Sequence, residues 1–351
     1  MTEFKAKKYQ EETDKYLLQL FDTDWENIPD ENIIWWEYET GKKVPLKKDT
    51  FTPILHVPEL KGYFQFVPKI TEGGQHRYIE TGRLKSDGPT TRVYKFQDLK
   101  TGRIVAGKLA FSQQDEEDTW DTRLLSLAQA RKHAGLVHPN IAVVFDLAMT
   151  NNRGSPEAEE LFYIMEWLSG GDLFYRVREK LSLTEVEEVI KQIGDGLQFI
   201  HDQGYIYADL KPDNIIFSGD GIAKLIDVGI TTKMDKAGKA VIKGGNDHFV
   251  SPEQRNWQPV DIRTDVYSLG ANIYFMLTGK TDFALRNRWR DSNDPLPVLE
   301  HYKAEFTEDT LSSLSSVLRK SLNLNPEDRF TSVRETVSEF TSFFPKNRPL
   351  S

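Results

Sequence analysis

The spacing of apolar residues changes along the chain. Between residues 76 and 168, apolar and polar positions alternate in short runs bounded by Gly, Pro and polar residues, a pattern typical of strands. Residues 92–111 contain two such runs around a Lys-Thr-Gly turn, and residues 140–150 and 161–168 contain two more. Residues 121–136 have helical spacing. This region is therefore predicted to be mostly β, with one helix.

The rest of the chain favours helices. Apolar residues in 183–204 recur at helical spacing, with Thr184 and Glu187 as a candidate capping box and Gly204 as a candidate C-terminal stop. Residues 264–279 are almost entirely apolar, which indicates a buried helix. Residues 308–323 and 331–344 are amphipathic, and 215–227 read as a hairpin. A small β-rich lobe followed by a larger helical lobe, an α+β fold, is the expected architecture.

The first 75 residues differ from this regular part. A charged stretch at residues 4–21 is expected to be helical. It leads into residues 31–46, where two extended runs flank a Thr-Gly turn and predict a hairpin. We interpret residues 1–75 as an accessory extension. Residues 76–345 then form the main domain, with an N-lobe of 76–167 and a C-lobe of 168–345, and residues 346–351 form a tail.

One stretch of the main domain, YIYADLKPDNIIF at residues 205–217, is hard to explain by packing. It places Asp209, Lys211 and Asn214 between apolar runs, although buried charge is costly unless it is paired or holds an ion. The following hairpin would return Asp227 to Asn214. A carboxylate and an amide oxygen suit Mg²⁺ with substrate phosphates. The alternative, a polar turn formed by Asp213 and its neighbours, does not explain this combination.

These residues carry a family resemblance. Over residues 76–345 the chain resembles eukaryotic-type (Hanks-type) serine/threonine protein kinases, and it is divergent within them. The matching motifs occur in the family's order: VAGK ending at Lys108, HPNI at 138–141, YIMEWLSGGDL at 163–173, YADLKPDN at 207–214, DVG at 227–229, SPE at 251–253, TDVYSLG at 264–270 and NPEDRF at 325–330. The resemblance implies a two-lobed kinase fold and phosphoryl transfer from ATP with Mg²⁺ or Mn²⁺ to protein hydroxyls.

The resemblance also implies roles for single residues. Asp209 would be the catalytic base, Lys211 would stabilise the γ-phosphate, and Asn214 and Asp227 would bind the metal. Lys108 would hold the α- and β-phosphates, and Arg329 would pair with Glu253 while Asp265 braces the catalytic loop. The remaining nucleotide contacts would be Gly88 of the glycine loop, Val93, Ala106, Met165 and Ile216 around adenine, the backbone of Glu166 and Leu168 at its edge, and Asp172 at the ribose.

The chain departs from the family pattern in several positioning parts. Only the central glycine of the glycine-rich loop, Gly88, is kept. Gln129 stands where a glutamate would pair with Lys108, so that contact loses its charge. Tyr207 and Ala208 replace His and Arg of the catalytic loop. Without that arginine, activation by a phosphate on the activation loop is expected to be absent.

Composition limits the alternatives. The chain has 351 residues, a net charge of −9 and no cysteine. This suits a cytoplasmic protein without disulfides, and it argues against nucleic-acid binding. No apolar run is long enough for a membrane anchor. An active kinase acting on protein substrates is the preferred hypothesis, and a nucleotide-binding pseudokinase acting as scaffold or regulator is the main alternative. Small-molecule phosphorylation is disfavoured by the C-lobe motifs.

Overall fold

In this computed structural model, the chain forms two compact units. One comprises Met1–Ala128 and Phe145–Met165, and the other comprises Gln129–Val144 and Glu166–Ser351. The structure describes residues 34–37, 42–45, 78–84, 93–112, 136–151, 159–227, 231–242 and 248–344. The helices expected at residues 4–21 and 121–136 lie almost wholly outside these residues.

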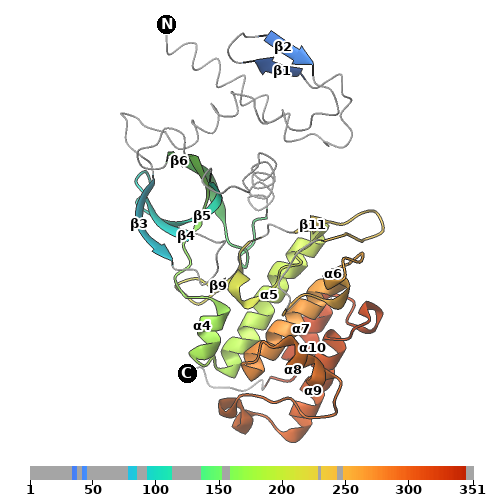
Figure 1. Cartoon of the computed structure of the whole chain (residues 1–351). Coiled ribbons are helices and arrows are strands. Elements are labelled where there is room, and N and C mark those ends of the chain that lie inside the picture. The colour runs from blue at the N-terminus through green and yellow to red at the C-terminus, as the bar shows by residue number, and fades with distance from the viewer. Residues whose placement is uncertain are drawn as a thin grey trace. The chain divides into compact units, whose positions relative to one another are not determined.

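A five-stranded sheet forms most of the described part of the first unit, in the order β3-β4-β5-β7-β6 (Figure 1). Its strands are β3 (Tyr78–Leu84), β4 (Val93–Asp98), β5 (Ile104–Ser112), β6 (Val144–Asn151) and β7 (Glu159–Glu166). The Lys-Thr-Gly turn between β4 and β5 is confirmed, and Asp98 closes it by accepting hydrogen bonds from Lys100 N and the Thr101 hydroxyl. Strand β3 was not among the strands predicted individually, and its pairing with β4 shifts register between Glu80 and Gly82.

One face of this sheet carries an aromatic core. Tyr94, Phe96 and Phe162 pack together, with ring centroids 5.2 Å (Tyr94–Phe162) and 5.5 Å (Phe96–Phe162) apart. This packing explains the glycine at position 107 of the VAGK motif. A Cβ atom on Gly107 would lie 2.1 Å from the Phe96 ring. The ring fills the space that a larger side chain would need.

The predicted hairpin near the N-terminus is confirmed. Strands β1 (Ile34–Glu37) and β2 (Lys42–Pro45) pair in antiparallel register.

Helices dominate the second unit, with α5, α7 and α10 side by side (Figure 1). They are α4 (Leu173–Arg178), α5 (Leu183–Asp202), α6 (Pro252–Arg255), α7 (Arg263–Thr278), α8 (Phe283–Arg290), α9 (Glu308–Ser321) and α10 (Val333–Thr341), with 3₁₀ turns η4 (Pro212–Asn214), η5 (Glu300–Glu305) and η6 (Pro326–Asp328). Every residue of α7 after its first is buried, as predicted. A Cβ atom on Gly194 of α5 would lie 2.3 Å from a methyl group of Val337 in α10. The close contact between α5 and α10 therefore requires glycine at position 194.

The start of α5 corrects one prediction. The capping box is formed by Ser182 and Glu185, not by Thr184 and Glu187. Two overlapping S/T-x-x-E patterns occur in the sequence, and the first one is used because the helix begins at Leu183, whose side chain is fully buried. Thr184 therefore lies inside the first turn. The predicted stop is confirmed, since Gly204 has φ +80° just after the helix.

Short strands connect these helices. The predicted hairpin is formed by β9 (Ile215–Phe217) and β10 (Ala223–Leu225). A second pair joins β8 (Tyr205–Ile206) to β11 (Thr232–Lys233).

The second unit includes the segment before β6, and the predicted lobe boundary at 167/168 stays a prediction. Residues 129–144 and 166–167 belong to the second unit. Hydrogen bonds explain this: Ala142 N donates to Leu225 O, Leu225 N donates to Asn140 O, and Glu166 N donates to Val143 O. These contacts anchor the segment before β6 to β10.

Candidate active site

The buried carboxylate of Asp265 fixes the backbone at the start of the predicted catalytic loop, residues 207–214. Asp265, near the start of α7, is 0% exposed. Its Oδ2 accepts hydrogen bonds from Tyr207 N (2.9 Å) and from His201 Nε2 (2.7 Å), and its Oδ1 accepts one from Ala208 N (2.8 Å). The bracing role expected for Asp265 is therefore seen in the structure, with His201 as an additional partner.

The three polar residues predicted as catalytic lie together at the end of this loop. Asp209 Oδ2 accepts hydrogen bonds from Lys211 Nζ at 3.0 Å and from Asn214 Nδ2 at 2.8 Å. Asn214 Nδ2 also donates to the Asp209 carbonyl at 2.9 Å. The side chain of Asp209 is only 11% exposed. These contacts hold the carboxylate in one orientation, with one ammonium group beside it.

The electrostatics of the site favour proton transfer. Burial raises the pKa of the Asp209 carboxyl above its ordinary value, and the negative charge of Asp227 adds to this, while the Lys211 ammonium opposes it. A carboxylate with a raised pKa is a better proton acceptor for a hydroxyl group.

Tyr207 links the catalytic loop to the strand end that carries Asp227. Its side chain is fully buried, and its hydroxyl donates to the Ile226 carbonyl at 2.6 Å. Burial raises the pKa of this phenol well above its ordinary value, so the hydroxyl keeps its proton and remains a donor. Ile226 N in turn donates to the Asn214 carbonyl at 3.0 Å. The hairpin thus returns the chain to Asn214, as predicted.

The donor atoms at this point suit a hard divalent cation. Asn214 Nδ2 donates to two acceptors of Asp209, which fixes the orientation of the amide and of its oxygen. Asp227, at φ +49°, directly follows the residue that hydrogen-bonds Asn214. An amide oxygen and a carboxylate are ligands that Mg²⁺ uses together with phosphate oxygens. These two residues therefore fit the metal role predicted for them.

The nucleotide residues predicted in the first unit share one face of the sheet. Val93 is directly opposite Lys108 in the β4–β5 register, and Ala106 lies two residues before Lys108. Side chains alternate along a strand, so these three, and Met165 in β7, lie on the face opposite the aromatic core. Gly88 and Gln129 lie outside the described residues.

The nucleotide residues predicted in the second unit have side-chain partners that the sequence did not suggest. The Glu166 carboxylate accepts hydrogen bonds from Val143 N (2.8 Å) and from Lys224 Nζ (2.8 Å). Asp172 Oδ1 caps α4 by accepting from Tyr175 N at 2.7 Å. The backbone of Asp172 forms an isolated antiparallel β-bridge with Ile216 of β9. Leu168 and Ile216 are both half-buried. The ribose and adenine roles stay predictions.

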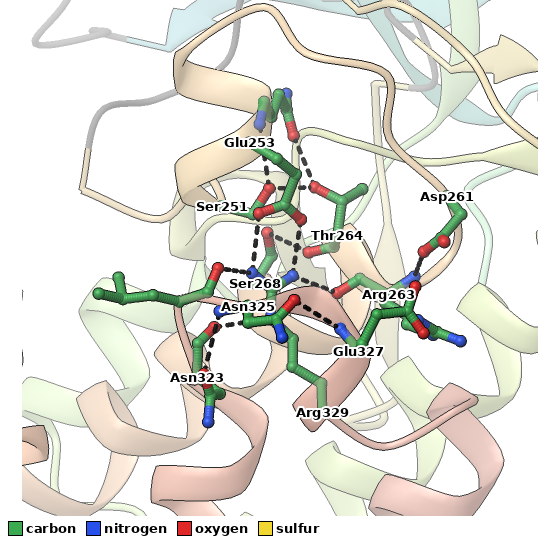
Figure 2. A network of polar contacts seen from close by, with 12 residues as sticks. Ser251, Glu253, Asp261, Arg263, Thr264, Ser268, Asn323, Asn325, Glu327 and Arg329 are labelled. Atoms are coloured by element: carbon green, nitrogen blue, oxygen red, sulfur yellow. Dashed lines mark hydrogen bonds and ion pairs between the residues drawn. The ribbon is translucent and has the colours of Figure 1, made fainter.

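A second polar network lies beneath α6 (Figure 2). The predicted pair is present: Arg329 Nη1 and Nη2 donate to the two oxygens of Glu253 at 2.6 and 2.8 Å. Ser251, the N-cap of α6, hydrogen-bonds the Thr264 hydroxyl of α7. The network fixes α6 onto α7, the helix whose Asp265 holds the catalytic loop.

Comparison with known proteins agrees with this geometry. Residues 83–340, more than half of the chain, match the family described as "Protein kinase domain". The chain therefore belongs to the protein kinase family. It is similar to a protein named "probable serine/threonine-protein kinase" from Clostridium acetobutylicum, with 28% identity over 73% of this chain and 38% of the relative.

Other relatives are also serine/threonine kinases or named for a kinase activity. Serine/threonine-protein kinase PknB of Mycobacterium tuberculosis is 30% identical over 73% of this chain and 41% of its own length. Smooth-muscle myosin light chain kinase of Gallus gallus is 30% identical over 65% of this chain and 11% of its own length. The chain thus spans at most about two-fifths of these relatives. Fold and domain match the Hanks-type serine/threonine kinases.

Proposed function

We propose that the chain transfers the γ-phosphoryl group of ATP to serine or threonine hydroxyls of protein substrates, with Mg²⁺ or Mn²⁺. The observation that carries this proposal is the Asp209 carboxylate, buried and held between Lys211 and Asn214 on a backbone fixed by Asp265. A polar turn formed by Asp213 and its neighbours would not require these buried contacts of Asp209 and Asp265. The groups that would contact the hydroxyl, the phosphates and the metal are all present in the sequence, namely Lys108, Asp209, Lys211, Asn214 and Asp227.

Each residue has a distinct task. Asp209 accepts the proton of the attacking hydroxyl and orients its oxygen. Lys211, 3.0 Å from Asp209, places positive charge where the transferred phosphoryl group becomes more negative in the transition state. Asn214 and Asp227 would hold the metal, which supplies charge neutralisation and orientation of the phosphates. Lys108 would bind the α- and β-phosphates.

The second candidate function is a pseudokinase that binds nucleotide and acts as a scaffold or regulator. Its support is the reduced glycine loop around Gly88, Gln129 in place of glutamate, and Tyr207-Ala208. These changes affect positioning groups, whereas the reacting groups are kept. We therefore favour the active enzyme. Among the described helices, none is long and apolar enough to cross a bilayer. The cytoplasmic location and the protein nature of the substrate stay predictions.

One assay separates the two candidates. Wild type, Asp209→Ala and Asp213→Ala are incubated with Mg²⁺, γ-labelled ATP and a generic basic protein. Asp213 is an exposed aspartate in the same loop, so its variant is the matched control. We expect label with wild type and Asp213→Ala, and at least about a hundredfold less with Asp209→Ala. Equal label with wild type and Asp209→Ala would contradict the kinase proposal.

A binding measurement tests the pseudokinase alternative. ATP with Mg²⁺ should raise the melting temperature of wild type and of Asp209→Ala alike, because Asp209 contacts the hydroxyl substrate and not the nucleotide. A thermal shift without any transfer would favour the pseudokinase. The absence of a shift with ATP and metal would reject both candidates.

A further inference from the structure

The peptide unit before Asp209 has an unusual conformation. Ala208 has φ +64°, in the left-handed region that costs a residue with a Cβ about 1–2 kcal/mol. Such a conformation persists only where the surroundings hold it in place. The alanine side chain is a methyl group and offers no hydrogen bond of its own. The backbone of Ala208 must therefore be held by other residues.

Two buried side chains hold this backbone from opposite ends. Asp265 Oδ1 accepts from Ala208 N at 2.8 Å, and Gln254 Nε2 donates to the Ala208 carbonyl at 2.8 Å. That carbonyl and the amide nitrogen of Asp209 belong to one planar peptide group. The hydrogen bond from Gln254 therefore fixes the plane from which Asp209 and its carboxylate extend.

Gln254 is itself held in one orientation. Its side chain is on α6 and is 1% exposed. Gln254 Oε1 accepts a hydrogen bond from the Thr264 hydroxyl at 3.2 Å, and Gln254 N donates to Ser251 Oγ at 3.3 Å. Figure 2 shows Ser251 and Thr264 joined in the network below α6. The Ala208 carbonyl can only accept, so the amide must present its nitrogen there.

We propose that Gln254 is a positioning residue for phosphoryl transfer, which holds the peptide that carries Asp209 and ties α6 to the catalytic loop without any phosphate group. The inference rests on the proposed function and adds to it a determinant outside the catalytic motif. It also accounts for a functional loop with alanine at position 208. The connection runs through an uncharged amide that is always present, so it needs no modification of the chain.

The first test is a steady-state comparison of Gln254→Met with wild type and with Gln258→Met. Methionine keeps the volume of glutamine and removes the donor. Gln258 is exposed in the loop after α6 and is the matched control. We expect kcat per folded protein to fall about ten- to a hundredfold in Gln254→Met, since a small displacement of a catalytic group has effects of that size. KM for ATP should change less than about twofold, and Gln258→Met should equal wild type.

The second test separates hydrogen bonding from packing. In Gln254→Glu, a protonated carboxyl can donate to the Ala208 carbonyl, whereas a carboxylate cannot and repels it. Burial raises the pKa of such a carboxyl toward neutrality. The kcat of Gln254→Glu relative to wild type should therefore rise at least about threefold as the pH falls from about 8.5 to 6. The same ratio for Gln254→Met should stay constant, because methionine does not titrate.

The outcomes assign the failure. An inactive wild type contradicts the proposed function. If wild type is active and Gln254→Met has the same kcat, the role of Gln254 alone is contradicted. The same holds if both variants show the same pH dependence relative to wild type. If Gln254→Met does not fold, the ratio for Gln254→Glu still decides, since a constant ratio across the pH range overturns the proposal.

Discussion

Replacing Arg329 by methionine should destabilise the second unit strongly. The side chain of Arg329 is 0% exposed, and the side chain of its partner Glu253 is 8% exposed. Besides the two bonds to Glu253, its guanidinium donates to three carbonyls, those of Arg263, Leu324 and Asn323. Methionine keeps the apolar stem but leaves the Glu253 carboxylate buried without its counter-charge. The three carbonyls lose a donor as well.

The expected loss can be estimated from this geometry. Breaking a buried, hydrogen-bonded ion pair on one side costs about 3–5 kcal/mol. A domain of this size loses about 2–4 °C of melting temperature per kcal/mol, so Arg329→Met should melt about 6–20 °C below wild type. Glu253→Gln should also destabilise, and the double variant should lose about 2–3 kcal/mol less than the sum of the single losses.

The measurement is urea unfolding of wild type, both single variants and the double variant. Arg334→Met is the control, because Arg334 is 76% exposed and lies 3.9 Å from Asp202. An exposed pair of this kind contributes less than about 1 kcal/mol. A loss below about 1 kcal/mol in Arg329→Met, or additive single losses, would show that the buried pair does not hold α6 in the way described.

Three further predictions concern other parts of the chain. Burial raises the pKa of Asp261, but the hydrogen bonds from Lys239 and Arg263 N, together with the positive charges of both residues, outweigh burial and hold the pKa below its ordinary value. The carboxylate therefore stabilises the fold above about pH 4 and loses this effect as the pH falls through its folded pKa, so Asp261→Asn should cost about 1–2 kcal/mol in urea unfolding at pH 7 and less as the pH is lowered below about 4. Arg286 is buried over two aromatic rings, burial lowers its pKa, and its guanidinium makes no hydrogen bond of regular geometry within the described part of the chain. Arg286→Met should then raise the melting temperature, and a fall would show that the guanidinium's contacts with Tyr267 and Phe283 stabilise the fold more than its burial costs. Gln129→Glu should leave kinase activity unchanged or increased, since it restores a charged partner for Lys108, and a collapse of activity would give Gln129 another role.

Local sequence signals predicted the parts of the fold that local interactions determine. The turn between β4 and β5 follows from Asp98 and the Thr-Gly pair within five residues of it. The β9–β10 hairpin and the buried helix α7 follow in the same way from turn residues and from the near absence of charge. Asp209, Lys211 and Asn214 also lie within one short loop, and the sequence singled them out together, but their mutual hydrogen bonds were not predicted.

Other features depend on residues far apart in the sequence. The carboxylate of Glu166 is held by Lys224, 58 residues away, so the sequence suggested only a backbone role for Glu166. Gln254 hydrogen-bonds the Ala208 carbonyl across 46 residues of sequence, and no local pattern predicts this contact. Its position directly after Ser-Pro-Glu was the one available signal. The start of α5 shows a further limit, because two cap patterns overlap and only burial of Leu183 selects between them.

The central claim is that the Asp209 site transfers phosphate and does more than bind nucleotide. The most direct measurement is a single turnover of labelled ATP with Mg²⁺ and excess protein substrate, comparing wild type with Asp209→Asn at equal nucleotide occupancy. The account predicts label on serine or threonine with wild type and at least about a hundredfold slower transfer with Asp209→Asn. Equal transfer rates, or full occupancy with no transfer by wild type, would contradict it.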